Sequence, residues 1–204
     1  DTIFSGGETS RQLFDHCYIE GTTDFIFGPG TAVFSQCTIL AKSNSFITAA
    51  STSKGRKYGF VFLNCTITAD PAVSKLSLGR PWRSNARTVF VKCSLPQAIT
   101  ATGWDNWGNP ENEKTVYYAE YKNTGTGAAI NGRVKWSKQL TDKEAQMYTP
   151  AQIFGLKESW YTNTQALSFK PELFAQRKAL IVPLYTGTVP NNKNVPDRET
   201  SVTT

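Results

Sequence analysis

The sequence lacks long hydrophobic runs, dense tracts of one charge and clear helical periodicity. No apolar run approaches the roughly 20 residues that a membrane-spanning helix needs, so we predict no membrane span. The 22 Lys and Arg residues give a formal net charge of +6, yet they are scattered along the chain. Nucleic-acid-binding arms concentrate such residues in short tracts, so this pattern argues against a nucleic-acid partner. The charge is equally compatible with a polyanionic substrate.

The chain has one histidine and four cysteines. It begins at Asp1, with neither Met nor a signal peptide before it, which predicts a fragment or a processed product. Of its 204 residues, 39% are hydrophobic and 19% are charged. This composition is typical of a soluble globular domain with a sizeable core.

A repeat occupies the first half of the chain. Every cysteine belongs to one of four similar segments, Leu13–Ile19, Val33–Ile39, Val61–Ile67 and Val89–Leu95. The cysteines are 20, 28 and 28 residues apart, within the period range of solenoid proteins. Together with the many β-branched and aromatic residues, this spacing predicts an all-β fold, a parallel β-helix.

The repeat also predicts how side chains stack. The Leu/Val, Cys and Ile/Leu positions of each segment are separated by even numbers of residues, which predicts one shared, inward face. Identical side chains in adjacent coils would lie about 4.8 Å apart and form internal Phe and Cys ladders. Two disulfides are compatible with such a stack, but small apolar side chains suit a repeated inward slot, which favours free, buried thiols. His16 stands where the other segments have Gln36, Asn64 and Lys92, which predicts a structural role near a bend.

A single carboxylate, Asp24, accompanies an apolar segment that ends at the turn Gly28–Gly30. Aromatic and β-branched residues predict a strand here, with Asp24 at its start. A carboxylate beside a buried strand must be paired, hydrogen-bonded or reactive. Satisfaction by backbone donors is the commoner outcome, so Asp24 alone does not define a site.

A second type of strand recurs between the cysteine-containing segments. The segments that align are Asp1–Phe4, Asp24–Phe27 and Ser45–Thr48, followed more loosely by Leu76–Gly79. This alignment places Asp1 over Asp24, one strand spacing of about 5 Å away, unless the match of a terminal residue is fortuitous. Two carboxylates so close do not both ionise easily, which would separate an acid from a base or nucleophile.

A family resemblance is carried by Asp1–Phe4, Gly21–Gly28, Leu78–Trp82, Gly103–Trp107, Tyr117–Asn123, Gly125–Ala128 and Arg133–Trp136. In composition and order these segments resemble the signatures of the pectin methylesterases. The resemblance covers most of the chain up to about the helical tail. It implies a right-handed parallel β-helix that hydrolyses the C6 methyl esters of galacturonate units in pectin and releases methanol. It implies no metal and no cofactor.

The resemblance also implies catalytic roles. Asp24 matches the nucleophile that attacks the ester carbonyl and forms an anhydride-type acyl-enzyme. Asp1 matches the general acid that protonates the departing methanol and then, as a base, activates water. Arg80 matches the arginine that keeps the nucleophile ionised and oriented. Stacking Leu76–Gly79 on Phe25–Gly28 leaves Arg80 a few residues past Asp24, so we expect a bulge or a register shift.

The resemblance assigns an aromatic substrate groove to Trp82, Trp107, Phe27 and Phe4. Phe4 stands where the family often has Tyr, and Trp104 suits the groove and the core equally well. In the family, the glutamines that stabilise the oxyanion precede the general acid. We therefore expect further chain, or a partner segment, before Asp1.

Two helix-capping signals follow the repeat. Thr141–Glu144 is a capping box that predicts a short helix to about Met147, and Thr149–Gln152 repeats the signal with Pro150 at the first helical position. We predict that these helices cap the end of the solenoid. The predicted domains are a catalytic β-helix over residues 1–165, with its N-terminal coils outside this chain, and a partly extended C-terminal extension over residues 166–204.

The leading interpretation is a secreted, monomeric esterase that acts on pectin in the extracellular space, cell wall or periplasm, with a proteinaceous inhibitor as a further partner. Neither nucleic acid nor membrane is an expected partner. One alternative is a pectate lyase or polygalacturonase-type β-helix, which would need calcium ligands or its own carboxylate pair. Another is a non-catalytic β-helix that binds pectin or serves as an adhesin.

Overall fold

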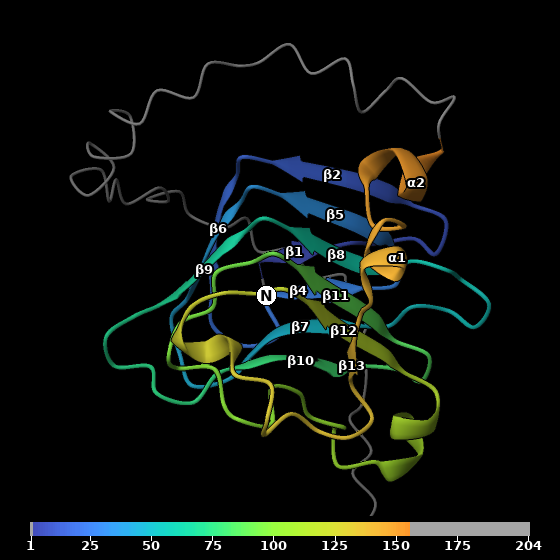
Figure 1. The fold of residues 1–204 in the computed structure, drawn as a ribbon. Helices are drawn as coiled ribbons and strands as arrows, with labels where there is room; N and C mark the ends of the chain where they lie inside the picture. Colours follow the sequence, from blue (N-terminus) through green and yellow to red (C-terminus); the bar gives the residue numbers. More distant parts are fainter. Residues whose placement is uncertain (1, 156–204) are drawn as a thin grey trace, which may run out of the picture. The chain divides into compact units, whose positions relative to one another are not determined.

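The computed structural model describes residues 2–155, in which the chain winds through three parallel β-sheets (Figure 1). Sheet A contains β1 (Ile3–Phe4), β4 (Ile26–Gly28), β7 (Phe46–Ala50) and β10 (Ser77–Pro81). Sheet B contains β2 (Arg11–Asp15), β5 (Thr31–Ser35), β8 (Phe60–Leu63), β11 (Arg87–Val91), β12 (Tyr117–Tyr121) and β13 (Lys138–Gln139). Sheet C contains β3 (Tyr18–Gly21), β6 (Thr38–Ala41) and β9 (Thr66–Ala69). From β1 to β11, each strand enters a different sheet from the strand before it, which is the parallel β-helix that the repeat predicts.

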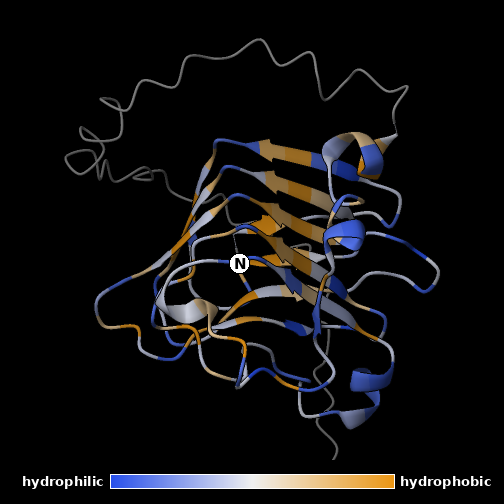
Figure 2. Ribbon diagram, viewed as in Figure 1, coloured by the Kyte–Doolittle hydropathy of each residue, from blue (hydrophilic) through white to orange (hydrophobic). Residues whose placement is uncertain are grey.

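The cysteine-containing segments stack in the predicted register. In sheet B, Leu13 pairs with Val33, Val33 with Val61, and Val61 with Val89. Hydrophobic residues follow the strands, and hydrophilic residues gather on the loops and short helices (Figure 2). Successive repeats of the sequence therefore form successive coils of the β-helix, with equivalent residues paired.

A left-handed residue marks the corner between sheets B and C in each repeat. The residues are His16, Gln36 and Asn64, each with a φ of 52°, and Lys92, with a φ of 53°. This confirms the structural role near a bend that was predicted for His16. Side chains alternate strictly between the two faces of a sheet only within a continuous strand. The alternation counted in one strand therefore does not continue into the next strand across a corner. The predicted common face is therefore correct for the Cys and Ile/Leu positions, which line the core together with the Phe positions. It is wrong for the Leu/Val positions, which pack on the outside of sheet B.

The interior contains the predicted phenylalanine ladder. The ring centroids of Phe14 and Phe34 lie 4.8 Å apart, those of Phe34 and Phe62 lie 4.6 Å apart, and those of Phe62 and Phe90 lie 4.3 Å apart. The rings of all three pairs are stacked and nearly parallel, which follows from the fixed spacing of parallel strands.

The cysteines form a parallel ladder of free thiols. The thiol of Cys37 lies 3.3 Å from the Phe14 carbonyl, and that of Cys65 lies 3.2 Å from the Phe34 carbonyl, each one coil away. Burial raises the pKa of the half-buried Cys17 thiol. The four cysteines are therefore free thiols, as favoured by the sequence, rather than two disulfides.

Two capped helices cover the outer face of sheet B (Figure 1). They are α1 (Asp142–Ala145) and α2 (Pro150–Phe154), preceded by the short 3-10 helices η1 (Pro110–Lys114) and η2 (Thr126–Ala128). Phe154 is 3% exposed and belongs to the same apolar cluster as Val33, Val61 and Val89. The predicted helices are present, but the prediction that they cap the end of the solenoid is wrong. They lie where outward-facing valines would otherwise expose an apolar patch.

The cap of α1 can be tested by mutation. The Thr141 hydroxyl accepts a hydrogen bond from the Glu144 N–H, and the Glu144 carboxylate accepts one from the Thr141 N–H. We expect Thr141→Ala to lower the free energy of unfolding by about 1 kcal/mol, measured by urea denaturation. Thr141→Ser keeps the hydroxyl and serves as the control. Equal midpoints for the two variants would contradict this role for the cap.

Two predictions on the ends of the chain lie outside the described residues. These are the domain boundary between residues 165 and 166, with the extension that follows it, and the position of Asp1. Among residues 2–155, no helix is both long enough and apolar enough to cross a membrane.

Candidate active site

Asp24 lies just before β4, at a turn in the left-handed backbone region. Its φ is 50°, and its N–H donates a 2.9 Å hydrogen bond to the Phe46 carbonyl on the next coil. Phe25 and Ile26 are fully buried and anchor the chain that follows, whereas the Asp24 side chain remains 15% exposed. The strand predicted to start at Asp24 therefore starts at Ile26. Non-glycine residues with positive φ are uncommon and cluster at functional sites.

The register of sheet A differs from the predicted alignment. Ile3 pairs with Ile26 as predicted, but Ile26 pairs with Thr48, one residue later than predicted. Gly79 also pairs with Thr48, so Gly79 lies level with Ile26 rather than with Gly28. A Cβ at Gly79 would collide with the Thr48 hydroxyl, so this close approach requires glycine.

Arg80, on β10, reaches Asp24 across two coils. Both Arg80 and Phe27 pair with Ala49, so the Arg80 backbone is level with Phe27 rather than with Asp24. The long side chain closes this gap: its Nε lies 3.1 Å from Asp24 Oδ1, and its Nη2 lies 2.7 Å from Asp24 Oδ2. The pair is thus a forked, charge-assisted interaction that fixes the plane of the carboxylate. The shifted register and the reach of the arginine together account for a contact that the alignment could not produce.

Two aromatic rings flank the Arg80 guanidinium. Its Cζ lies 4.1 Å from the Phe46 ring centroid and 3.7 Å from the Trp107 ring centroid. Cation–π contacts of this length hold the guanidinium in place and reduce its hydration. Trp107 has a φ of 61°, and its N–H donates to Asp105 Oδ1 at 2.6 Å. Sequence reasoning missed Phe46, whose position becomes apparent only with the correct register of β7.

The predicted groove residues assemble around Asp24. The rings of Phe4 and Phe27 lie 5.0 Å apart, and those of Phe27 and Trp82 lie 6.0 Å apart, edge to face. Phe4, Trp82 and Trp107 are 57%, 36% and 38% exposed. A cleft of about 170 Å³ is lined by Asp24, Phe27, Ala49, Trp82 and Trp107. Exposed aromatic rings around a fixed carboxylate suit a sugar-like ligand, because flat apolar faces pack against sugar rings.

Trp104 belongs to the core. It is 2% exposed, its ring stacks on Tyr118 at 4.5 Å, and its indole N–H donates to Glu120 Oε1 at 3.3 Å. Glu120 in turn forms a buried ion pair with Arg133. Both charged residues come from segments that carried the family resemblance, and their contacts are structural.

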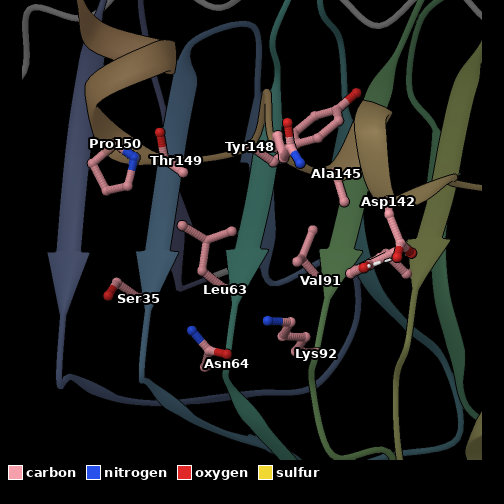
Figure 3. Close-up of a pocket in the computed structure, with 12 residues that line it drawn as sticks. Ser35, Leu63, Asn64, Val91, Lys92, Asp142, Ala145, Tyr148, Thr149 and Pro150 are labelled. Atoms are coloured by element: carbon pink, nitrogen blue, oxygen red, sulfur yellow. Dashed lines mark hydrogen bonds between the residues drawn. The ribbon is translucent and has the colours of Figure 1, made fainter. Parts of the chain in front are cut away.

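A larger cavity of about 500 Å³ lies away from Asp24, between sheet B and the α1–α2 segment (Figure 3). Leu63 and Val91 face the helices, while Asn64 and Lys92 lie at the corner of the coils. None of the predicted site residues lines it. Within residues 2–155, His, Cys, Asp and Glu side chains form no group of three or more that could hold a metal ion.

The fold and the cleft define a parallel β-helix protein with a carboxylate–arginine pair in an aromatic cleft. The pectinesterase family profile matches residues 1–157, and the chain belongs to the pectinesterase family. It is 38% identical to probable pectinesterase/pectinesterase inhibitor 64 of Arabidopsis thaliana over 80% of this chain and 30% of that protein. It is 43% identical to pectinesterase 31 of Arabidopsis thaliana over 66% of this chain and 43% of that protein. The chain thus spans less than half the length of these relatives.

Solved structures agree with the fold. The pectin methylesterase from carrot superimposes with a TM-score of 0.70 at 38% identity, over 76% of this chain and 53% of that chain. The pectin methylesterase from Yersinia enterocolitica gives a TM-score of 0.66 at 30% identity, over 76% of this chain and 56% of that chain. A pectin methylesterase in complex with a hexasaccharide gives 0.59 at 28% identity, over 74% of this chain and 52% of that chain. The predicted right-handed parallel β-helix is therefore confirmed.

Proposed function

We propose that the protein carrying this chain hydrolyses the C6 methyl esters of galacturonate units in pectin. The observation that carries the proposal is the forked Asp24–Arg80 pair inside the aromatic cleft. Membership of the pectinesterase family supports the same reaction. A partly exposed, oriented carboxylate is what a nucleophile needs, because it must reach the substrate and also remain ionised.

In the proposed reaction, an Asp24 oxygen attacks the ester carbonyl carbon and forms a tetrahedral oxyanion. The C–O bond to methanol then breaks, Asp1 protonates the departing methoxide, and an anhydride acyl-enzyme remains. Asp1, now a base, takes a proton from water, which attacks the galacturonyl carbonyl and releases the galacturonate carboxyl group and free Asp24. Arg80 holds Asp24 in its reactive plane, and the flanking rings limit the movement of the guanidinium.

The aromatic residues are proposed to bind the polymer. Phe27, Trp82 and Trp107 line the cleft, and Phe4 extends the aromatic surface beside Phe27. Exposed aromatic side chains can pack against successive sugar rings and hold one ester at Asp24.

Partners and location follow from the same proposal. The hexasaccharide complex of a related pectin methylesterase supports a pectin-like polymer as the substrate. Several relatives carry both pectinesterase and pectinesterase inhibitor in their names, which supports a proteinaceous inhibitor as a partner. Action on pectin requires an extracellular, cell-wall or periplasmic location. We further propose that the enzyme acts as a monomer.

Methanol release tests the proposed function. Protein produced from the complete coding sequence should release methanol from highly methylated pectin and leave new carboxylates on the polymer. Chelation of calcium should not change the rate, and no unsaturated sugar should form, because ester hydrolysis leaves the glycosidic bonds intact. Unsaturated products would indicate a lyase, shortened chains a polygalacturonase, and binding without any product a non-catalytic protein. Each of these outcomes would contradict the esterase.

A further inference from the structure

A second group of aromatic and cationic side chains lies at the start of the sheet B strands. Lys57 and Tyr58 precede β8, whereas Arg87, Tyr117 and Lys138 are the first residues of β11, β12 and β13. Parallel strands begin at one edge of a sheet, and Arg87 pairs directly with Tyr117 there. We call these five residues the tyrosine–cation surface.

Each cation of this surface lies over a tyrosine ring. Lys57 Nζ is 5.1 Å from the Tyr58 ring centroid, Arg87 Cζ is 5.0 Å from that of Tyr117, and Lys138 Nζ is 4.7 Å from the same Tyr117 centroid. None of the three cations forms an ion pair with any residue in the range 2–155. Their positive charges are therefore held in place by the rings and remain available to a ligand.

A hollow of about 230 Å³ adjoins these side chains. Its lining consists of Lys57, Tyr58, Arg87, Tyr117, Glu144, Met147 and Tyr148. The Tyr58 hydroxyl donates to the Met147 carbonyl at 3.1 Å, and the rings of Tyr58 and Tyr148 meet edge to face at 5.8 Å. These contacts connect the start of the sheet B strands to the turn after α1, and the connected residues form one wall of the hollow.

The hollow remains positively charged overall. Its one carboxylate, Glu144, accepts hydrogen bonds of 2.8 Å from the Thr141 N–H and hydroxyl, so it is engaged in the cap of α1. Burial, followed by the neighbouring Tyr117 hydroxyl, raises the pKa of Tyr148, so this phenol adds no negative charge at neutral pH. The lining thus contains two cations, Lys57 and Arg87, and Lys138 lies beside it. Its single carboxylate already accepts hydrogen bonds from Thr141.

The combination of fixed cations and aromatic rings fits a polymer that has both carboxylates and sugar rings. We propose that the tyrosine–cation surface is a second, non-catalytic binding site for de-esterified uronate stretches of the polymer. This choice of polymer rests on the proposed function, which generates such carboxylates. The cations neutralise the carboxylates, while the tyrosine rings and Met147 offer apolar contacts to the sugars.

One polymer can contact both sites. Trp82, in the cleft, and Arg87, on the surface, are five residues apart in the sequence. Their Cα atoms are therefore separated by no more than about 18 Å. Between them, Arg83 lies over the Trp82 ring at 5.0 Å and adds a cation at the rim of the cleft. Binding of an already de-esterified stretch would keep neighbouring esters close to Asp24, because the second contact becomes intramolecular.

The test is a pair of charge-matched triple variants of the full protein. The surface variant carries Lys57→Gln, Arg87→Gln and Lys138→Gln. The control variant carries Lys75→Gln, Lys92→Gln and Lys135→Gln, which are exposed cations elsewhere on the described chain. The Kd for a long, fully de-esterified oligogalacturonate is measured by calorimetry at two ionic strengths, with thermal unfolding as the check on folding.

We expect the surface variant to bind at least about tenfold more weakly at low ionic strength and to show a reduced salt dependence. The control variant should change Kd by less than about twofold. Equal affinities of the two variants would overturn the proposal. So would competition by dextran sulfate as strong as that by oligogalacturonate, because the surface would then attract any polyanion. The ligand carries no ester, so the result stands whether or not the protein releases methanol.

The contribution of the rings is tested separately. Tyr58→Leu keeps the charge of Lys57 but removes the ring, and we expect it to weaken oligogalacturonate binding by a larger factor than the binding of dextran sulfate. Equal losses for both polymers would contradict a role for the ring in contacting sugar.

Discussion

Replacement of Asp24 by asparagine is expected to reduce methanol release from methylated pectin by at least about 1,000-fold. Asparagine keeps the shape of the side chain and can still accept a hydrogen bond from Arg80. Its amide oxygen is neutral, however, and cannot form the anhydride intermediate. The expected loss is in kcat, measured by enzymatic detection of methanol with protein produced from the complete coding sequence. KM for pectin should change little, because the aromatic lining of the cleft is untouched.

Asp70→Asn is a matched control for this experiment. Asp70 is a half-buried carboxylate that follows β9 in sheet C, away from the cleft. Its replacement removes the same charge and should leave methanol release unchanged. Thermal unfolding of both variants shows whether the fold is retained. Methanol release by Asp24→Asn at the rate of the unaltered protein would reject Asp24 as the nucleophile.

The coils were predictable because solenoids repeat their interior. A segment that places Phe and Cys at the same positions four times can stack them only if successive coils have the same shape. The face of the sheet on which each side chain lies was harder to predict, because the left-handed corners at His16 and its counterparts interrupt the alternation of side chains. If the alternation of side chains is counted across such a corner, every residue on one side of the corner is assigned to the wrong face of the sheet.

The Asp24–Arg80 pair came from the family resemblance rather than from the alignment of strands. Short apolar strands define their register weakly, and the contact between Gly79 and Thr48 that fixes sheet A involves a glycine and a hydroxyl with no distinctive pattern. Phe46 was missed for the same reason, since its role depends on the true register of β7.

The helices show a similar division between local and distant information. The caps at Thr141 and Thr149 are local signals, so the existence of α1 and α2 could be predicted. Their location depends on the outward-facing valines of sheet B, which in turn depends on the corners. The tyrosine–cation surface was missed because its members are far apart in the sequence and meet only through the edge of the sheet.

The buried ion pair between Glu120 and Arg133 leads to the largest expected effect on stability. The Arg133 Nε lies 2.7 Å from Glu120 Oε1, and its Nη2 lies 3.2 Å from Oε2. The two side chains are 5% and 2% exposed, and Arg133 also donates to the Gly127 carbonyl at 2.7 Å. Loss of the arginine would leave the Glu120 carboxylate without its counter-charge in the core. We expect Arg133→Met to lower the free energy of unfolding by about 3–5 kcal/mol, measured by urea denaturation.

The double variant Arg133→Met, Glu120→Met separates two explanations of that loss. If the cost arises from an uncompensated buried charge, removal of the second charge should recover most of it, since well-packed apolar pairs often match buried ion pairs in stability. Trp104 and Asn123 would each lose a hydrogen bond to Glu120, which limits the recovery. A double variant as unstable as Arg133→Met would show that the pair stabilises this end of the β-helix through its hydrogen bonds. An Arg133→Met variant as stable as the unaltered protein would contradict both explanations, because the buried Glu120 carboxylate would then tolerate the loss of its only ion-pair partner among the described residues.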